Sequence, residues 1–162
     1  VEVLLGESAD CATLHLPKGV VKAVCISEAK GTQKHDVGEV MLVEEHGIQG
    51  DAHAGKWHRQ VSLLAAESVA KVQKALDFEL KSGDFAENIL TEGIELYTLP
   101  VGTRMQIGEA EGEVTQIGKE CHHGCAIREL AGDCVMPREG IFIRVTKGGK
   151  VKAGDRIQVL QM

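Results

Sequence analysis

The chain has 162 residues, enough for one domain that buries about two thirds of the surface of its unfolded chain. Hydrophobic residues make up 43% and charged residues 26%, which is typical of a globular protein and argues against a disordered one. The net charge of −6 disfavours nonspecific binding to nucleic acid or to an anionic membrane, so we expect neither as a partner. No apolar stretch approaches the ~20 residues of a membrane span, and no signal peptide is recognisable.

The five cysteines are Cys11, Cys25, Cys121, Cys125 and Cys134. Their odd number and uneven spacing fit poorly with the disulfide framework of a secreted protein, so we expect free thiols and a cytoplasmic location. Cys25 alternates with apolar residues in the segment VVKAVCIS. We therefore predict that Cys25 packs in the core as a small hydrophobic residue.

Residues 1–19 differ from the rest, and we assign them to an N-terminal extension of unclear role, with one domain over 20–162. From residue 20 onward, short β-branched segments alternate with glycine-containing turns, which predicts a mostly β, mostly antiparallel barrel or sandwich. The predicted strands are 20–26, 38–43, 60–64, 87–90, 104–107, 112–117, 140–146 and 155–160. Apolar residues at helical spacing predict the longest helix at 65–76.

The densest group of reactive residues is the segment Gly-Lys-Glu-Cys-His-His-Gly-Cys at 118–125. A thiol reacts as a nucleophile in its thiolate form, and neighbouring cations lower the pKa of the thiol. Lys119, His122, His123 and Arg128 all lie within seven residues of Cys121. One interpretation is therefore that Cys121 is an activated sulfur nucleophile.

Two other interpretations of this segment remain open on spacing alone. Zinc sites use paired Cys or mixed Cys/His ligands, and Cys121 and Cys125 have no matching second pair, although Cys134 and His53 could complete four ligands. Alternatively, the cysteines are buried and unreactive beside solvated histidines.

The segment Gly47-Ile-Gln-Gly-Asp-Ala-His-Ala-Gly55 predicts a tight, exposed loop. No acidic residue occurs from 52 to 66, whereas Lys56, Arg59 and two histidines do. Such a patch in an acidic chain is a candidate anion site, because an arginine side chain offers planar bidentate contacts to phosphate. The alternative is a loop that carries solvated charges. The spacing is not that of a P-loop.

Three further segments have distinctive compositions. The sequence at 83–89 predicts a turn into a strand, with Glu87 and Asn88 capping backbone groups. Proline and glycine bracket Arg138 at the entrance of a strand. The sequence at 148–155 predicts a set of turns that closes the last hairpin.

Taken in order, these segments resemble the MOSC domain, the module named after the C-terminal part of molybdenum-cofactor sulfurases. The resemblance covers roughly residues 20–160. It rests on GIQGDAHAG with Arg59, GDFAENI, LPVGTRMQIG, the segment ending in Cys121, REG at 138–140 and GGKVKAGD. Each piece alone is short, and their common order is what makes the resemblance specific.

The resemblance implies a closed β-barrel with a few short helices, similar to the β-barrel domain of pyruvate kinase. Members of the family bind molybdopterin or the molybdenum cofactor, or handle sulfur destined for metal-sulfur centres. The motif cysteine of the family falls on Cys121. Other family positions fall on Gly50, Asp51, His53, Arg59, Glu87, Asn88, Arg138 and Gly140.

The sequence departs from the family pattern in three ways. Glu120 stands where many members have proline, and a carboxylate beside a thiol opposes thiolate formation. Cys125 has no counterpart in the general motif. The 162 residues hold no pyridoxal-phosphate domain, which supplies cysteine desulfurase activity in the full sulfurases. The chain is most similar to the free-standing bacterial type, and it would need a separate sulfur donor such as a cysteine desulfurase.

The function implied by the resemblance is binding of the molybdenum cofactor (molybdopterin) and sulfur carriage in its assembly or sulfuration. Cys121 would carry a persulfide or ligate molybdenum, a metal that suits a soft thiolate ligand. Expected partners are the phosphorylated pterin, the sulfur donor, and molybdenum-cofactor assembly proteins or molybdoenzymes. The residues expected to bind the cofactor are Asp51, His53, Lys56, Arg59, Asn88, Lys119 and Arg138.

Within that set, Arg59, Lys56 and Arg138 are expected to hold the phosphate, and Asn88 and Asp51 to pair with pterin amides. Such a site requires loop 50–59 and Arg138 to approach Cys121 in one pocket. Whether the chain is an enzyme is left open; if it is, a sulfurtransferase-like reaction with Cys121 as sulfur acceptor is expected. The alternatives are a molybdenum-dependent reductase component for N-hydroxylated substrates and a zinc-stabilised interaction module without chemistry.

Overall fold

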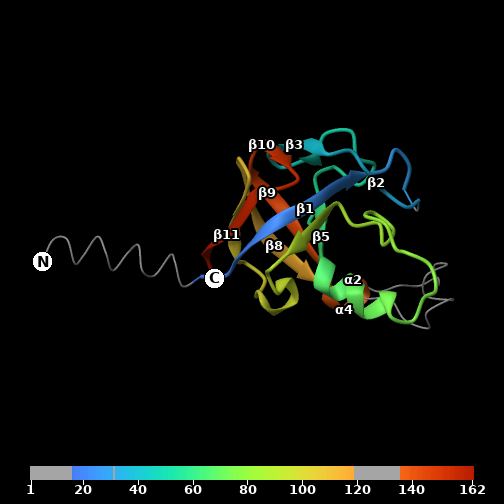
Figure 1. Ribbon diagram of the computed structural model, residues 1–162. Helices are drawn as coiled ribbons and strands as arrows, with labels where there is room; N and C mark the ends of the chain where they lie inside the picture. Colours follow the sequence, from blue (N-terminus) through green and yellow to red (C-terminus); the bar gives the residue numbers. More distant parts are fainter. Residues whose placement is uncertain (1–15, 31, 119–135) are drawn as a thin grey trace, which may run out of the picture.

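The computed structural model describes residues 16–30, 32–118 and 136–162. In these residues seven strands close into a barrel in the order β11-β7-β8-β9-β5-β6-β1, and pairing of β1 with β11 completes the ring (Figure 1). The barrel strands are β1 (Lys18–Ile26), β5 (Val61–Ala65), β6 (Ile89–Glu92), β7 (Arg104–Ile107), β8 (Ala110–Ile117), β9 (Ile141–Lys147) and β11 (Arg156–Gln161). The predicted closed, mostly β barrel is confirmed.

Strand pairing around the barrel is antiparallel except between β5 and β6, which run parallel. A parallel pair needs a crossover connection, because its second strand must start again from the same end as the first. Helix α2 (Ala66–Gln73) and the loop that follows it supply this crossover. The prediction of a mostly antiparallel barrel is therefore confirmed, with one parallel exception.

The core is built from aliphatic side chains that alternate inward along the strands. In β9, Ile141, Ile143 and Val145 are fully buried and belong to the main cluster of the barrel interior. Cys25 is also fully buried, as predicted. Burial, together with the charges of Glu87 and Asp36, raises the pKa of the Cys25 thiol to about 12. This thiol stays protonated at neutral pH and serves as a packing group.

Three short strands were not predicted as separate elements. Strand β2 (His35–Asp36) pairs with the end of β1, and β4 (Gly47–Ile48) pairs with β3 (Glu39–Val43). On its other edge β3 pairs with β10 (Gly149–Lys152), which was predicted only as turns that close the last hairpin. That prediction was wrong for 149–152, because these residues form a strand on β3.

The helices lie together at one side of the barrel (Figure 1). Helix α2 is the longest helix of the described residues; it ends at Gln73, three residues before the predicted end. The Gln73 side chain explains this end, because it donates to Phe78 O (2.7 Å) and accepts from the Leu80 amide (2.8 Å) in the following loop. The other helices are η1 (Leu96–Thr98) and α4 (Met136–Glu139).

An ion pair joins α2 to α4. Glu139 accepts hydrogen bonds from Ser68 Oγ (2.6 Å) and Lys71 Nζ (2.9 Å). Burial alone would raise the pKa of Glu139, but the hydrogen bonds from Lys71 and Ser68 outweigh it and lower that pKa. Helix α4 is thereby fixed beside α2 at the entrance of β9.

Strand β1 begins two residues before the predicted start of the barrel. Lys18 and Gly19 pair with Gln158 and Ile157 of β11, and Val159 donates its amide to Pro17 O (2.9 Å). These contacts close the barrel, so residues 18 and 19 contribute to it. Most of the predicted extension, residues 1–15, lies outside the described residues.

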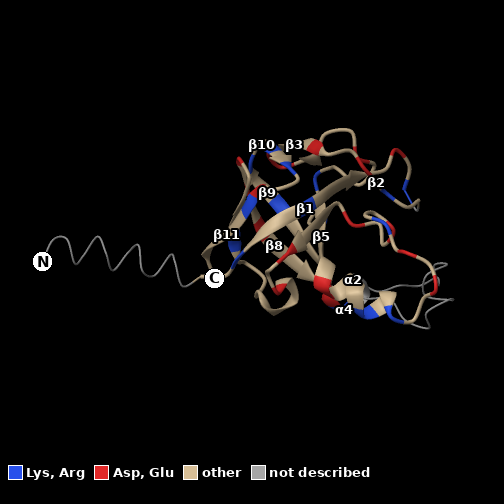
Figure 2. Cartoon of the chain, in the orientation of Figure 1, with Lys and Arg blue, Asp and Glu red and all other residues tan. Residues whose placement is uncertain are grey.

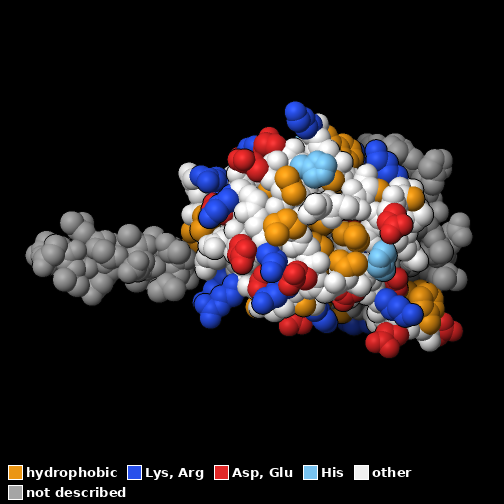
Figure 3. All heavy atoms as spheres, turned by 90° about the horizontal axis from the view of Figure 1, so that it is seen from above, with side chains coloured by type: hydrophobic (Ala, Val, Ile, Leu, Met, Phe, Trp, Pro, Cys, Tyr) orange, Lys and Arg blue, Asp and Glu red, His pale blue; other side chains and the backbone are white. Residues whose placement is uncertain are grey.

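Charged side chains of both signs are distributed over the strands and loops (Figure 2). On the face that carries the three-stranded sheet of β10, β3 and β4, hydrophobic side chains appear as separate patches among charged and polar ones (Figure 3). Met41 and Val43 of β3 are among the exposed hydrophobic residues. Within the described residues, none of the helices combines the length and apolar character that crossing a membrane would require.

Candidate functional site: a cationic pocket at the barrel rim

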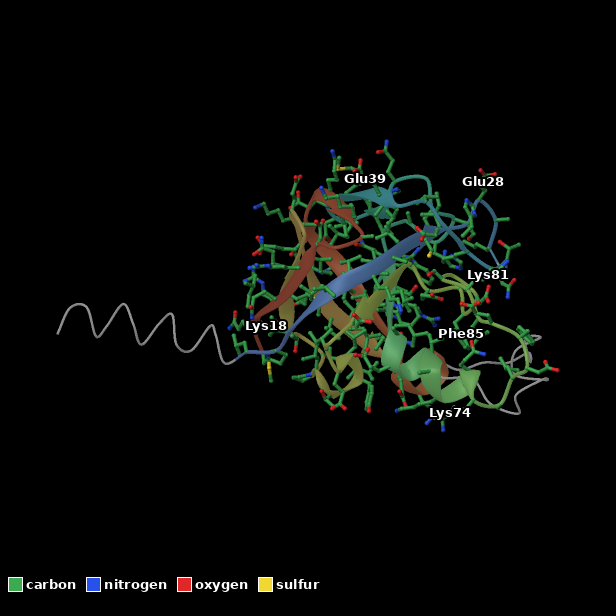
Figure 4. All side chains as sticks on the ribbon, in the orientation of Figure 1. Lys18, Glu28, Glu39, Lys74, Lys81 and Phe85 are labelled. Atoms are coloured by element: carbon green, nitrogen blue, oxygen red, sulfur yellow. The ribbon has the colours of Figure 1, made fainter. Side chains whose placement is uncertain are left out.

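A pocket of about 80 Å³ lies at the rim where β1 and β8 end and β6 and β9 begin. Figure 4 shows this end of the molecule near Glu28 and Lys81, far from Lys18 at the start of β1. Four separate segments of the chain contribute side chains, so the site forms only in the folded barrel. The lining residues are Lys34, His53, Trp57, Arg59, Ser62, Ala86, Asn88 and Phe142.

Loop 50–59 follows β4 and is held by a buried aspartate. Asp51 accepts hydrogen bonds from the Ser27 amide (3.1 Å) on one oxygen and the His53 amide (3.2 Å) on the other. Gly50 has φ +88°, a left-handed conformation that glycine adopts without strain. The Asp51 side chain is completely buried, which places it beneath the loop.

The partner of Asp51 is Lys34, a residue that sequence reasoning missed. Lys34 Nζ donates to Asp51 Oδ1 (2.6 Å) and Ser27 Oγ (3.3 Å), and it lies 3.0 Å from His53 Nδ1. Burial alone would raise the pKa of Asp51; the hydrogen bonds from Lys34 and Ser27 outweigh it, and that pKa is lowered. The result is a buried ion pair that touches a pocket histidine.

Arg59 is enclosed by aromatic rings. Its guanidinium carbon lies 5.6 Å from the Trp57 ring centre and 5.5 Å from that of Phe142, distances at which a cation attracts a ring face. Within the described ranges, Arg59 Nε is buried and has no hydrogen-bond partner. Among the described residues, no carboxylate lies within ion-pair distance of Arg59. A buried donor without a partner is costly, which marks this edge of the guanidinium as one that a ligand acceptor could satisfy.

The segment at 83–88 closes the other side of the pocket. Glu87 is buried and accepts from the amides of Gly83 (2.7 Å) and Phe85 (3.1 Å), as its predicted capping role requires. Burial is the main reason why the pKa of Glu87 is raised, since those amide hydrogen bonds act against it. Ala86 has φ +62°, an uncommon conformation for a residue with a Cβ.

Gly83 also has a packing role. A Cβ at this position would lie 2.1 Å from the carbonyl oxygen of Lys34, and the Lys34 amide donates to Gly83 O (3.0 Å). The absence of a side chain at Gly83 therefore lets the segment that carries Lys34 approach the turn. This close approach helps to place the ammonium group beneath the pocket.

Three side-chain hydrogen bonds hold Asn88 in the strand framework. Its Oδ1 accepts from the Ser62 amide (3.0 Å) and Ser62 Oγ (3.2 Å), and its Nδ2 donates to Cys25 O (3.0 Å). Asn88 thereby ties β5 and β1 to the start of β6. Its predicted pterin contact would have to use the second N–H of the same amide.

The remaining predicted residues divide into two groups. Lys56 and Arg138 are exposed, and neither lines the pocket. Cys121 and Lys119 lie outside the described residues, as do Cys125 and Cys134. The predicted approach of loop 50–59 and Arg138 to Cys121 therefore stays a prediction.

The described chain does define where the Cys121 segment joins the barrel. Strands β8 and β9 pair as far as Ile117 and Ile141, and the Gly118 amide donates to Gly140 O (2.6 Å). The adjacent residues reach the pocket, because Phe142 lines it and Gln116 Oε1 lies 2.8 Å from Nε2 of His58 in loop 50–59. Gly118 precedes Cys121 by three positions. The described chain therefore ends, three positions before Cys121, at the rim that carries the pocket.

A search of the described residues for three or more His, Cys, Asp or Glu side chains that could hold a metal ion finds none. Three of the four residues considered as zinc ligands, all cysteines, lie outside these residues. The zinc interpretation consequently stays open.

Fold and pocket together define a closed β-barrel domain with a small cationic site at its rim. The chain belongs to the MOSC domain family, whose family model matches residues 50–158. The match includes loop 50–59, the segment at 83–88 and Cys121, and this family is associated with the molybdenum cofactor. A comparison with curated proteins finds no match.

Solved structures share the fold at low sequence identity. The YuaD protein from Bacillus subtilis has a TM-score of 0.75 and 17% identity, over 90% of this chain and 97% of that chain. YiiM from Geobacillus stearothermophilus has a TM-score of 0.66 and 16% identity, over 90% and 76% of the two chains. YiiM from Escherichia coli has a TM-score of 0.59 and 20% identity, over 91% of this chain and 70% of that chain. At these identities the likeness shows the fold.

Proposed function

We propose that this chain binds the molybdenum cofactor at the rim pocket and carries sulfur on Cys121 for assembly or sulfuration of the cofactor. The observation that carries the proposal is Arg59, whose buried Nε has neither a hydrogen-bond partner nor an ion-pair carboxylate among the described residues. An anionic oxygen would supply the missing acceptor and the missing counter-charge.

The size of the pocket favours one part of the cofactor. A volume of about 80 Å³ accommodates a group the size of a few water molecules, well below the 300–1,000 Å³ or so of sites that enclose a whole organic ligand. We propose that the pocket takes the terminal phosphate and that the pterin extends outward over the rim. Lys56 and Arg138, both exposed, would then attract the anion from outside the pocket.

Sulfur carriage is assigned to Cys121 by its family position. Gly118, three positions before Cys121, lies at the rim that carries the proposed phosphate site, and this position supports the proposal that the thiol meets a bound cofactor. In this arrangement Cys121 would hold a persulfide or ligate molybdenum, whose soft character suits sulfur. The sulfur donor and the acceptor protein would be separate partners.

The test of the phosphate site uses inorganic phosphate as the probe and Trp57 as the reporter. Trp57 is the single tryptophan of the sequence and lies beside Arg59, so its fluorescence should change on binding. Arg59→Met should weaken phosphate binding by about tenfold or more, because a charge-assisted hydrogen bond is lost. Arg144→Met is the matched control, since Arg144 pairs with Glu45 and Glu113 outside the pocket. Equal affinities for the two variants would contradict the proposal.

The test of sulfur carriage compares Cys121→Ser with Cys125→Ser. After incubation with a cysteine desulfurase and cysteine, the protein is assayed for sulfane sulfur and for bound molybdenum and zinc. We expect Cys121→Ser to lose sulfane sulfur and Cys125→Ser to retain it. The opposite result would assign the carrier to Cys125, and zinc without molybdenum would favour the interaction module.

A further inference from the structure

The buried ammonium group of Lys34 has no donor left for a ligand. An ammonium group carries three N–H donors and no acceptor. Lys34 Nζ has three partners: Asp51 Oδ1 at 2.6 Å, Ser27 Oγ at 3.3 Å and His53 Nδ1 at 3.0 Å. Although Lys34 lines the pocket, a direct contact with a ligand would require it to give up one of them. While Lys34 keeps all three partners, it can influence the site only through its contact with His53.

The contact with Lys34 determines which ring nitrogen of His53 carries the proton. Because the ammonium group can only donate, His53 Nδ1 must accept with its lone pair. A neutral imidazole that accepts at Nδ1 carries its proton on Nε2. A proton on Nδ1 would place two donors 3.0 Å apart, in a pocket that Arg59 also lines.

The reverse assignment, with a neutral Lys34 that accepts from His53, is disfavoured by Asp51. The Lys34 and Asp51 side chains are 1% and 0% exposed, and their 2.6 Å contact is the only salt bridge to Asp51 among the described residues. A neutral lysine would leave a buried carboxylate without a counter-charge, which costs far more than one hydrogen bond. Lys34 therefore stays charged and His53 stays the acceptor at Nδ1.

We propose that Lys34 is a positioning residue that holds His53 in the neutral tautomer protonated at Nε2, so that His53 serves the site as a hydrogen-bond donor and not as a base. This inference deepens the proposed function and rests on it for the identity of the ligand, an anionic phosphate. It also excludes His53 as the base that would deprotonate Cys121. Since Nδ1 is occupied by Lys34 and Nε2 already carries a proton, His53 cannot accept the proton of a thiol in this arrangement.

The experiment is ¹⁵N nuclear magnetic resonance of the histidine rings in the full chain. The chain has seven histidines, and a His53→Gln variant assigns the His53 signals. In phosphate-free wild-type protein near neutral pH, we expect Nδ1 to resonate as an unprotonated nitrogen and Nε2 as a protonated one. A mixture of tautomers, or a proton on Nδ1, would overturn the proposal without any variant of Lys34.

The role of Lys34 is tested by removing both charges of the buried pair. Lys34→Met alone leaves a charged, unpaired Asp51 beneath His53, so the double variant Lys34→Met/Asp51→Asn is used. We expect this variant to show a mixture of His53 tautomers, with average ¹⁵N shifts for both ring nitrogens. Lys71→Met, which removes an ion pair outside the pocket, is the control and should keep the wild-type tautomer. An unchanged tautomer in the double variant would overturn the role of Lys34.

Addition of inorganic phosphate tests the donor role. Binding is followed by Trp57 fluorescence, and the Nε2–H resonance of His53 should shift with the same affinity. If phosphate binds and that resonance does not respond, the donor role is wrong while the proposed phosphate site stands. If Trp57 fluorescence shows no binding, the proposed function fails, and the tautomer of the phosphate-free protein still decides the role of Lys34.

Discussion

Two groups of ion pairs in this barrel differ in their access to water. At the rim pocket, the Lys34–Asp51 pair is almost completely buried. On the barrel surface, Arg144 bridges Glu45 (2.5 Å) and Glu113 (2.9 Å), with 37% of the arginine side chain exposed. Surface pairs form at little cost, but a buried pair loses the hydration of both charges. Replacing a buried pair by hydrophobic residues of similar volume often leaves a protein equally stable or more stable. The buried pair is therefore better explained by the histidine that it fixes than by stability.

The largest expected effect is the difference between Lys34→Met and Arg144→Met. Lys34→Met should lower the free energy of unfolding by about 3–5 kcal/mol, because Asp51 is left charged and buried. Arg144→Met should lower it by about 1 kcal/mol or less, since water solvates Glu45 and Glu113. Denaturant unfolding of the three proteins measures both values. Similar losses for the two variants would show that breaking the buried pair costs no more free energy of unfolding than breaking the surface pairs.

A smaller effect is expected from a methyl group at Gly83. Gly83→Ala should cost about 3 kcal/mol, because Gly83 has φ +92° and its Cβ would collide with the carbonyl of Lys34. Gly50→Ala is the matched control, with φ +88° and no atom within 4 Å of its Cβ, and should cost about 1 kcal/mol. Thermal unfolding compares them. Equal costs would mean that backbone conformation alone matters at Gly83, and that its contact with Lys34 does not.

The smallest expected effect is a pair of opposite pH dependences at the same rim. The pKa of Asp51 is lowered in the folded protein, so its contribution to stability is present near pH 7 and is lost as the pH falls through that pKa. The pKa of Glu87 is raised, so its contribution is present at low pH and is lost as the pH rises through that pKa.

Two variants make these dependences measurable. Between about pH 7 and about pH 4, the destabilisation caused by Glu87→Gln should increase. The destabilisation caused by Asp51→Asn should decrease only below about pH 4, because the pKa of Asp51 lies under its ordinary value. Urea unfolding at several pH values gives both slopes. Slopes of the same sign would show that one of the two carboxyl groups does not have the pKa shift that its contacts predict.

Sequence patterns were sufficient for the barrel because its signal is local and repeated. The apolar alternation in 104–107 or 140–146 requires only one buried face, and the structure has strands at these places. Strand β2 was missed because two polar residues, His35 and Asp36, carry no alternation. Strand β10 was read as turns because Gly149, Lys150 and Lys152 are not strand-forming, and its pairing with β3 is a tertiary effect.

The site was predicted only in part, for a similar reason. Loop 50–59 is recognisable by its glycines and its basic residues, and the structure places His53 and Arg59 in the pocket. Lys34 gave no signal, because a single lysine in a polar segment normally lies in water, and its partner Asp51 is 17 positions away. Phe142 was likewise read as one residue of a strand, although its ring faces Arg59.

The hydrogen bond between Gly118 and Gly140 has a consequence for how such a barrel can diversify. Because β8 and β9 are already joined at this point, residues 119–139 connect two neighbouring antiparallel strands of the barrel. Lengthening a hairpin loop adds little closure entropy, since that cost grows only logarithmically with loop length. The length and the sequence of the connection between Gly118 and helix α4 can thus change, while the strand register and the small pocket beside it are kept.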